Sequence, residues 1–169
     1  MIRSLGKRKP RIDTSVFISE GAYVVGDIEI GKNSSIWPGA VLRADRFRIR
    51  IGSNCSIQDN CVIHAGVSDV IIGNNVTIGH GSVIHCARIG DVILIGMHAT
   101  LSSFSEIGDS SIIGAHSMVG DHFKVPPRSL VVGVPAKIKR SVTRKEINDI
   151  ISGTDFYVDL ARDFKKRGL

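Results

Sequence analysis

The sequence predicts an all-β solenoid, a parallel β-helix of hexapeptide repeats that ends in one C-terminal α-helix. Three observations predict this fold. Aliphatic residues recur every six positions from Ile12 to Val125. Aromatic residues make up only 5% of the chain while glycine occurs 18 times, so the core must be aliphatic and the backbone must turn often. The repeat then stops at a proline-rich segment, and a helical pattern follows it.

The six-residue series breaks in three places. A nine-residue step follows Leu42, another follows Ile63, and a five-residue step follows Ile84. Each break comes after the third member of a set of three. This indicates a coil with three faces, because a corner that opens to solvent tolerates insertions and a stacked strand does not. A period of six fits neither an α-helix nor hairpins, and it predicts coils stacked about 4.8 Å apart. The series is Ile12, Ile18, Val24, Ile30, Ile36, Leu42, Ile51, Ile57, Ile63, Ile72, Ile78, Ile84, Ile89, Ile95, Leu101, Ile107, Ile113, Val119 and Val125.

The chain divides into a β-helix over residues 1–135 and a C-terminal linker and helix over 136–169. The segment "VPPRSLVVGVPAKIKR" ends the repeat, and Thr143-x-x-Glu146 offers a capping box for the start of a helix. We expect the helix to pack on the outside of the β-helix through one apolar stripe that is interrupted at Gly153. The stripe consists of Ile147, Ile150, Ile151, Tyr157, Leu160, Ala161 and Phe164.

Composition excludes several classes of protein. The net charge is +6, but much of the basic excess lies at the two ends without interleaved aromatic residues, so we expect no nucleic-acid partner. The cysteines, Cys55, Cys61 and Cys86, are odd in number and form no C-x-x-C motif, which favours a reducing compartment. We expect Cys55 and Cys61 to fill the core. No apolar stretch approaches 18 residues, so we expect a soluble, cytoplasmic protein without a membrane partner.

The repeat register assigns directions to the histidines of "IGHGSVIHC". His64 and His85 each follow an inward residue of the third face, as Arg43 does, so these three side chains form one outward column. His64 and His85 are then one strand spacing apart, close enough for both to bind one metal ion. His80 stands two residues after an inward residue of the second face, near a different corner.

A third metal ligand from the same chain is therefore awkward, whereas one from a neighbouring chain is natural. Three chains about an axis parallel to the coils would create three equal sites between subunits. Asp59 precedes His80 by one coil, and the same packing would bring it toward Arg43 of the next chain. Outward-facing Val62 and Val83 suit a buried contact. We interpret the remaining histidines as solvated surface residues: His98, His116 and His122.

At these residues the chain resembles the gamma-class carbonic anhydrases, in particular their shorter ferripyochelin-binding-protein-like branch of the hexapeptide-repeat superfamily. The similar segments are "VLRADRFRIRIGSNCSIQDNCVIH", "IGHGSVIHCARIGDVILIGM", "VVGVPAKIKR" and "FYVDLA". The resemblance implies a left-handed β-helix and a homotrimer. It also implies zinc, with iron or cobalt as substitutes, bound by His64 and His85 of one subunit and His80 of the next.

The resemblance implies roles for further residues. Arg43, Asp45 and Asp59 match the family's interface ion-pair positions. Gln58 matches the residue that orients the metal-bound water or the substrate, and Tyr157 matches a tyrosine of the C-terminal helix near the site. The implied activity is reversible hydration of carbon dioxide to bicarbonate by metal-bound hydroxide.

The sequence departs from the founding branch of this family at two glutamates. Arg46 occupies the place of the first, and the segment "AGVSD" after His64 is too short to supply the second. We therefore expect turnover to be slow or to depend on buffer, which would accept the proton.

Two other classes of function remain open. The first is a metal-dependent thioesterase or hydrolase, or a hexapeptide acyltransferase that uses one histidine as general base. The second is a non-catalytic trimeric scaffold whose metal only locks the subunits together. Sensitivity to a chelator separates the acyltransferase from the metal-dependent enzymes.

Overall fold

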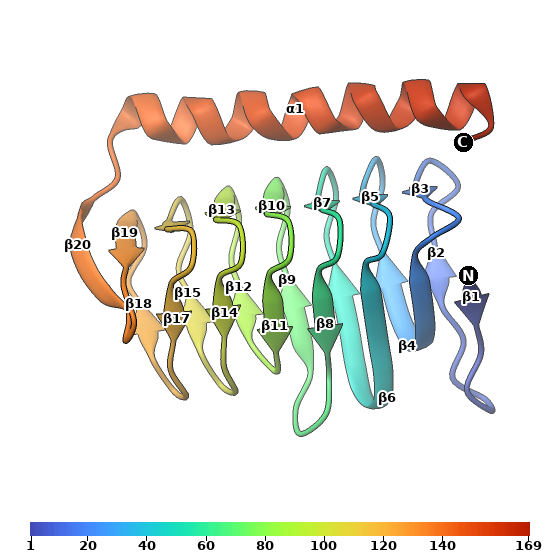
Figure 1. The fold of residues 1–169 in the computed structure, drawn as a ribbon, viewed down its shortest axis with the longest axis horizontal. Helices are drawn as coiled ribbons and strands as arrows, with labels where there is room; N and C mark the ends of the chain where they lie inside the picture. Colours follow the sequence, from blue (N-terminus) through green and yellow to red (C-terminus); the bar gives the residue numbers. More distant parts are fainter.

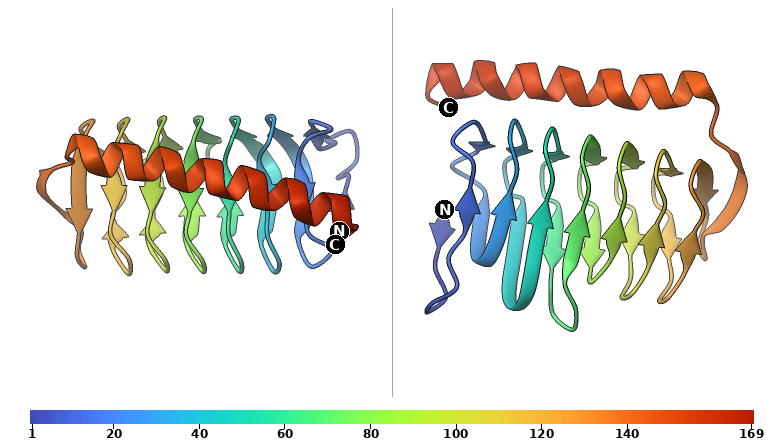
Figure 2. Two further views of the ribbon diagram at one scale, coloured as in Figure 1. Left: turned by 90° about the horizontal axis from the view of Figure 1, so that it is seen from above. Right: turned by 180° about the vertical axis from the view of Figure 1, so that it is seen from behind.

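Short parallel strands stack along one axis into a left-handed β-helix of about seven turns, with a single helix lying along its side (Figure 1). The computed structural model describes all residues from Met1 to Leu169. Figure 2 shows from above and from behind that the helix runs the length of the solenoid, so that the two ends of the chain lie at the same end of the molecule. The predicted fold class is confirmed.

The strands lie on three faces, as the repeat predicts. The second face is an eight-stranded sheet. The first and third faces join in a twelve-stranded sheet, because β4 (Tyr23–Ile30) and β6 (Val41–Ile51) run round the corner between them. The other strands of the third face are β1 (Ile2–Arg3), β8 (Val62–His64), β11 (Val83–His85), β14 (Thr100–Leu101) and β17 (Met118–Val119). Those of the first face are β2 (Arg11–Ile12), β9 (Val70–Ile72), β12 (Arg88–Ile89), β15 (Glu106–Ile107) and β18 (Lys124–Val125).

The second face carries eight strands. They are β3 (Phe17–Ile18), β5 (Ser35–Ile36), β7 (Ser56–Ile57), β10 (Val76–Ile78), β13 (Ile93–Ile95), β16 (Ile112–Ile113), β19 (Ser129–Val132) and β20 (Lys137–Ser141). β20 pairs antiparallel with β19, whereas every other pair is parallel. The sheet therefore continues past residue 135, into the segment that the sequence assigned to the linker.

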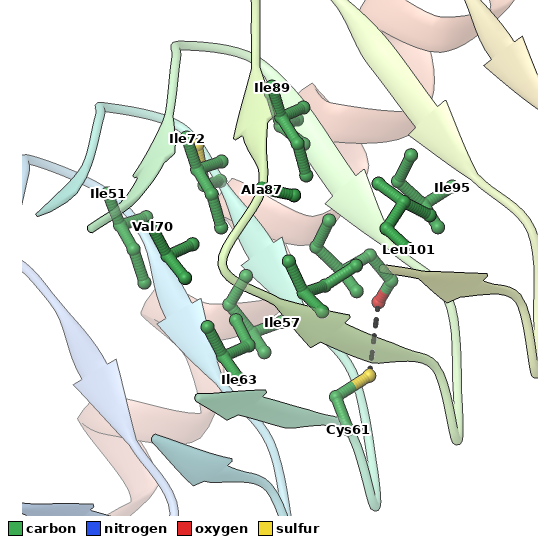
Figure 3. Packing of buried hydrophobic residues seen from close by; sticks show 14 of the residues in the cluster. Ile51, Ile57, Cys61, Ile63, Val70, Ile72, Ala87, Ile89, Ile95 and Leu101 are labelled. Atoms are coloured by element: carbon green, nitrogen blue, oxygen red, sulfur yellow. Dashed lines mark hydrogen bonds between the residues drawn. The ribbon is translucent and has the colours of Figure 1, made fainter. Parts of the chain in front are cut away.

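The repeated aliphatic positions point inward and form the core. All are buried except Ile12 and Ile18, which belong to the first coil and are only partly covered. Cys55 and Cys61 lie in this core, as predicted. Figure 3 shows Cys61 among the aliphatic side chains. The Cys61 thiol also donates to the backbone carbonyl oxygen of Gly79 at 3.1 Å. Stacking of like residues in successive coils removes this surface from water, which is the main stabilisation of such a solenoid.

The helix α1 (Arg144–Arg167) begins at the predicted capping box. The side chain of Thr143 accepts from the backbone N–H of Glu146, and the carboxylate of Glu146 accepts from the backbone N–H of Thr143. The helix continues without a break through Gly153. The prediction that Ile151 belongs to the apolar stripe was wrong, because Ile151 is 39% exposed on the outer side of the helix. No helix in the structure combines the length and the apolar character that crossing a lipid bilayer requires.

Helix α1 covers the second face. At its C-terminal end it packs against an aromatic cluster in which the Trp37 ring lies 5.2 Å from that of Phe17 and 5.3 Å from that of Phe164. The indole N–H of Trp37 donates to the hydroxyls of Ser35 and Ser56, both at 3.0 Å, so the buried indole keeps a partner. This packing fixes the helix over β3, β5 and β7 and brings Tyr157 to the edge of the second face.

Candidate metal centre

The third face carries the predicted column of outward side chains. Arg43 in β6, His64 in β8 and His85 in β11 are successive partners in the parallel ladder. The imidazole rings of His64 and His85 lie 5.3 Å apart, tilted by 41°. Both rings are partly buried. Two imidazoles stacked at one strand spacing present their ring nitrogens on the same side of the sheet, which is what a shared ion needs.

His85 is held by a neighbour in the next coil. Its Nδ1 lies 3.0 Å from the hydroxyl oxygen of Ser103, so its Nε2 is the nitrogen left for a ligand. The strand ladder pairs Ile84 with Leu101 and so places Ser102 opposite His85. The next residue, Ser103, is the one that reaches the ring, and sequence reasoning missed it.

His64 is positioned by two neighbours. Its Nε2 lies 3.3 Å from the Oδ1 atom of Asp45, whose carboxylate also contacts Arg43. A side chain at Gly66 would bring a Cβ atom within 2.6 Å of the His64 ring, so only glycine leaves the imidazole in this position. Sequence reasoning also missed Gly66, whose signal is a glycine two residues after the histidine in a short corner.

Asp45 remains ionised beside His64. Burial opposes ionisation, but the hydrogen bond with His64 and the charge of Arg43 outweigh it, so the pKa of Asp45 lies below its usual value. For Nε2 of His64 to bind a metal, the Asp45 carboxylate must turn away from it, and Arg43 is in place to keep that carboxylate paired.

His80 lies at the corner between the second and third faces, beside Asp59 and Gln58. Its Nδ1 is 2.9 Å from a carboxylate oxygen of Asp59. Its backbone N–H donates to Oε1 of Gln58 at 3.1 Å, which fixes the orientation of that amide. Gln58 is only 5% exposed. The amide NH2 group of Gln58 is thereby directed toward Tyr157 on the helix.

Tyr157 keeps its proton at neutral pH. Burial and the negative charge of Asp59 raise the pKa of this phenol, while a hydrogen bond from Gln58 opposes the shift. The phenol is therefore a hydroxyl group that can both donate and accept.

The chain does not bring all the predicted residues together. No group of three or more His, Cys, Asp or Glu side chains in this chain is close enough to hold one metal ion. Arg43 contacts Asp45, and Asp59 contacts His80, so Arg43 and Asp59 are not paired within the chain. The remaining histidines are exposed, as predicted: His98 stacks on His116 at 5.2 Å, and His122 stacks on Phe104 at 4.9 Å.

The donor set fits a metal such as zinc. The imidazoles of His80 and His85 each have one nitrogen engaged by an oxygen-bearing neighbour and the other available. This is the pattern of metal-ligating histidines, in which the second nitrogen is held by a carboxylate, a carbonyl or a hydroxyl. Two histidines on one face and one at another corner can serve one ion only if a second copy of the chain supplies the missing ligand.

The chain is similar to known hexapeptide-repeat proteins. A family model described as bacterial transferase hexapeptide (six repeats) matches residues 9–44. A Methanocaldococcus jannaschii protein named "Probable carbonic anhydrase" is 45% identical over 89% of this chain and 95% of its own length. The mitochondrial gamma carbonic anhydrase 2 of Arabidopsis thaliana is 37% identical over 92% of this chain, which spans 58% of that longer protein.

A solved structure is similar over almost its whole length. It is a Bacillus cereus protein assigned as an acetyltransferase, with a TM-score of 0.94 and 34% identity over 96% of this chain and 95% of that one. Relatives of comparable identity that share this β-helix are thus named either as carbonic anhydrases or as an acetyltransferase. Fold alone does not distinguish these two activities, so the residues of the site must do so.

Proposed function

Because the chain belongs to the gamma carbonic anhydrase family, we propose that it catalyses the reversible hydration of carbon dioxide to bicarbonate at a zinc ion, for which iron or cobalt can substitute. His64 and His85 of one subunit and His80 of the next hold the ion. One observation supports this proposal. Asp59 holds Nδ1 of His80 and Ser103 holds Nδ1 of His85, which leaves the Nε2 atom of each ring available to bind the ion.

The partner in this proposal is a homotrimer. Beside the histidine column, the third face carries a second outward column that is mostly apolar, at residues that are partners in the ladder: Tyr23, Val41, Val62, Val83, Thr100 and Met118. Tyr23, Val62, Val83 and Met118 are each 37–39% exposed. An exposed apolar strip next to incomplete metal ligands suits contact with another copy of the chain. Three copies around one axis close the assembly and complete three equal sites.

The metal and the chain contribute different parts of the chemistry. When bound, the metal lowers the pKa of a water to about 7 and so supplies hydroxide at neutral pH. Gln58, oriented by the His80 backbone, offers its NH2 group to an oxygen atom of the reactants. Tyr157, whose pKa is raised, offers a hydroxyl proton beside it. These two donors orient carbon dioxide and stabilise the charge that develops on its oxygen atoms.

The arrangement offers no carboxylate free to carry the proton away. Asp45 is held by Arg43 and His64, and Asp59 by His80. Asp69, the one carboxylate of the short loop after His64, accepts from the backbone N–H of Arg48 at 2.8 Å. Turnover therefore depends on buffer, which accepts the proton directly.

A second candidate function is acyl transfer or thioester hydrolysis. It is favoured by the structural similarity to the Bacillus cereus protein that is assigned as an acetyltransferase. A transferase that uses a histidine as general base keeps its activity after chelation of the metal, and a metal-dependent thioesterase loses it. A metal that only locks subunits together supports neither activity.

The experiment that tests the proposal measures stopped-flow carbon dioxide hydration and metal content on the zinc-loaded protein. His80→Ala should lose both, and His98→Ala, which removes an exposed histidine from the same corner one coil later, should keep both. The subunit-shared site is tested by mixing His64→Ala with His80→Ala subunits. Neither variant alone has a complete site, whereas a mixed trimer forms one where the intact His64 of one subunit meets the intact His80 of the next. Recovery of activity on mixing supports the shared site, and hydration that survives in His80→Ala contradicts it.

A further inference from the structure

A cavity of about 380 Å³ lies between α1 and the second face. Its floor is a row of outward side chains from successive coils, Thr77, Leu94 and Ile112, which are partners in the parallel ladder. Its roof is the first half of α1, where Ile150 and Gly153 line it. The row spans two strand spacings, about 10 Å.

The cavity meets the candidate site at one end. Gln58 and Tyr157 both line it. Gln58 accepts from the backbone N–H of His80, and Tyr157 is a hydrogen-bond partner of Gln58. Gln58 follows β7, the strand next to Thr77 in the ladder, so this polar end lies at the opposite end of the row from Ile112. The cavity is thus an apolar extension of the site.

Helix α1 packs differently at its two ends. Its C-terminal half packs through Phe164 on the rings of Phe17 and Trp37. Over β13 and β16, Leu94 and Ile112 stay only partly buried although the helix lies above them. Apolar side chains that a helix covers but does not contact tightly leave room for another apolar group.

Gly153 keeps this space open. Glycine is a poor residue for a helix interior, because it loses more backbone entropy on folding than alanine does. A Cβ atom at Gly153 would have no atom within 4 Å outside the adjacent helical backbone, so no close contact requires glycine there. Its backbone is helical, so conformation does not require it either. What a larger side chain would take away is the volume of the cavity.

The charges around the cavity select against an anion. No lysine or arginine lines it, and its far end carries the carboxylates of Glu146 and Asp149. These carboxylates are already paired, Glu146 with Arg140 at 2.7 Å and Asp149 with Lys145 at 2.8 Å. A negatively charged tail would find no unpaired cation here, so the lining favours an uncharged ligand.

We propose that this cavity binds the aliphatic chain of a small uncharged carbonyl compound, whose carbonyl oxygen accepts from the Gln58 amide and the Tyr157 hydroxyl. The assignment of the polar end rests on the proposed function, in which the same two donors orient carbon dioxide. The site therefore accepts carbonyl compounds with a chain of several carbon atoms in addition to the smallest substrate.

The test uses zinc-loaded full-length protein with labelled Ile and Leu methyl groups, titrated with methyl hexyl ketone, which cannot be hydrolysed. We expect saturable shifts of the methyl signals of Leu94, Ile112 and Ile150. Acetone, which lacks the chain, should bind more weakly by about fourfold for each missing methylene that the cavity buries. Gly153→Leu should weaken binding of the longer ketone by about tenfold or more. Ser152→Leu, which places the same side chain on the exposed side of the helix, should not.

Carbon dioxide hydration is measured on the same samples, so that a failure of the proposed function can be told apart from a failure of the cavity proposal. Ketone binding without any hydration overturns the proposed function and keeps the cavity. Normal hydration with no methyl shift up to the solubility limit of the ketone overturns the cavity proposal, as does equal binding by Gly153→Leu. If Gly153→Leu does not fold, Ile112→Phe fills the cavity from its floor instead. This variant should likewise weaken binding of the longer ketone, and equal binding would overturn the cavity proposal.

Discussion

The Nδ1 atom of His80 lies 2.9 Å from a carboxylate oxygen of Asp59. This hydrogen bond decides which nitrogen of the ring remains for a metal, because it ties the tautomer and the ring orientation to a residue one coil below. Burial, together with the negative charge of the same carboxylate, raises the pKa of Tyr157. One acidic residue thus acts both on a candidate ligand and on a nearby phenol.

Asp59→Asn tests the first of these roles. The amide keeps the shape of the side chain but loses its charge, so the His80 ring is held less firmly and its Nε2 is less basic. We expect metal affinity to fall by about 10- to 100-fold, measured by competition with a chelator. Asp121→Asn, an exposed aspartate away from the site, is the control. Equal affinity of Asp59→Asn and the parent protein would remove Asp59 from the metal centre.

Gly66→Ala tests how closely the backbone confines His64. The added methyl would lie 2.6 Å from Cε1 of the imidazole, so the ring must turn away from its position above Asp45. We expect metal affinity to fall by about tenfold or more while the fold is retained, as judged by circular dichroism. Gly120→Ala is the matched control, because a Cβ at Gly120 meets no atom within 4 Å. A metal affinity unchanged in Gly66→Ala would mean that His64 does not ligate from this position.

The start of helix α1 should weaken in acid. A hydrogen bond from Arg140, followed by those from Thr143, lowers the pKa of Glu146 below its usual value. A carboxyl group with a depressed folded-state pKa stabilises the fold above its unfolded pKa of about 4.3. That contribution is lost as the pH falls below this value toward the folded pKa.

Hydrogen exchange of the first-turn amides of α1 measures this effect. Exchange protection should fall between about pH 5 and about pH 3 in the parent protein and change less in Glu146→Gln. Glu20→Gln, at an exposed carboxylate just after β3 and so at the other end of the solenoid from the first turn of α1, should behave as the parent does. Identical profiles for the parent and Glu146→Gln would show that the cap does not depend on this charge.

The core cysteines should resist alkylation in the folded protein. Burial raises the pKa of the Cys55 thiol to about 12 and that of Cys61 to about 11, so neither is a thiolate at pH values of about 8. Iodoacetamide should therefore modify both only after unfolding in denaturant, as followed by mass spectrometry. Rapid modification of either one under native conditions would contradict the packing of these coils.

Much of the fold could be predicted because the hexapeptide repeat is a local signal. Every inward aliphatic residue from Val24 to Val125 is buried, and the column of Arg43, His64 and His85 follows from the same register. The helix start was equally local, since Thr143 and Glu146 are only three residues apart. The exposed position of Ile151 was missed, because a helical stripe does not specify how wide the contact with a sheet is.

The repeat register is enough to predict the periodic core, the position of His64 next to Arg43 in one column, and the separation of His80 from both, because each depends on counting residues within one coil. The folded chain was needed to show that Ser103 holds His85, that Gly66 leaves room for His64, and that α1 leaves a cavity beside Gln58 and Tyr157. Those relationships depend on rotamers at the corners and on how closely a helix packs on a sheet. Both are set by the shapes of side chains from distant segments, and the repeat does not encode them.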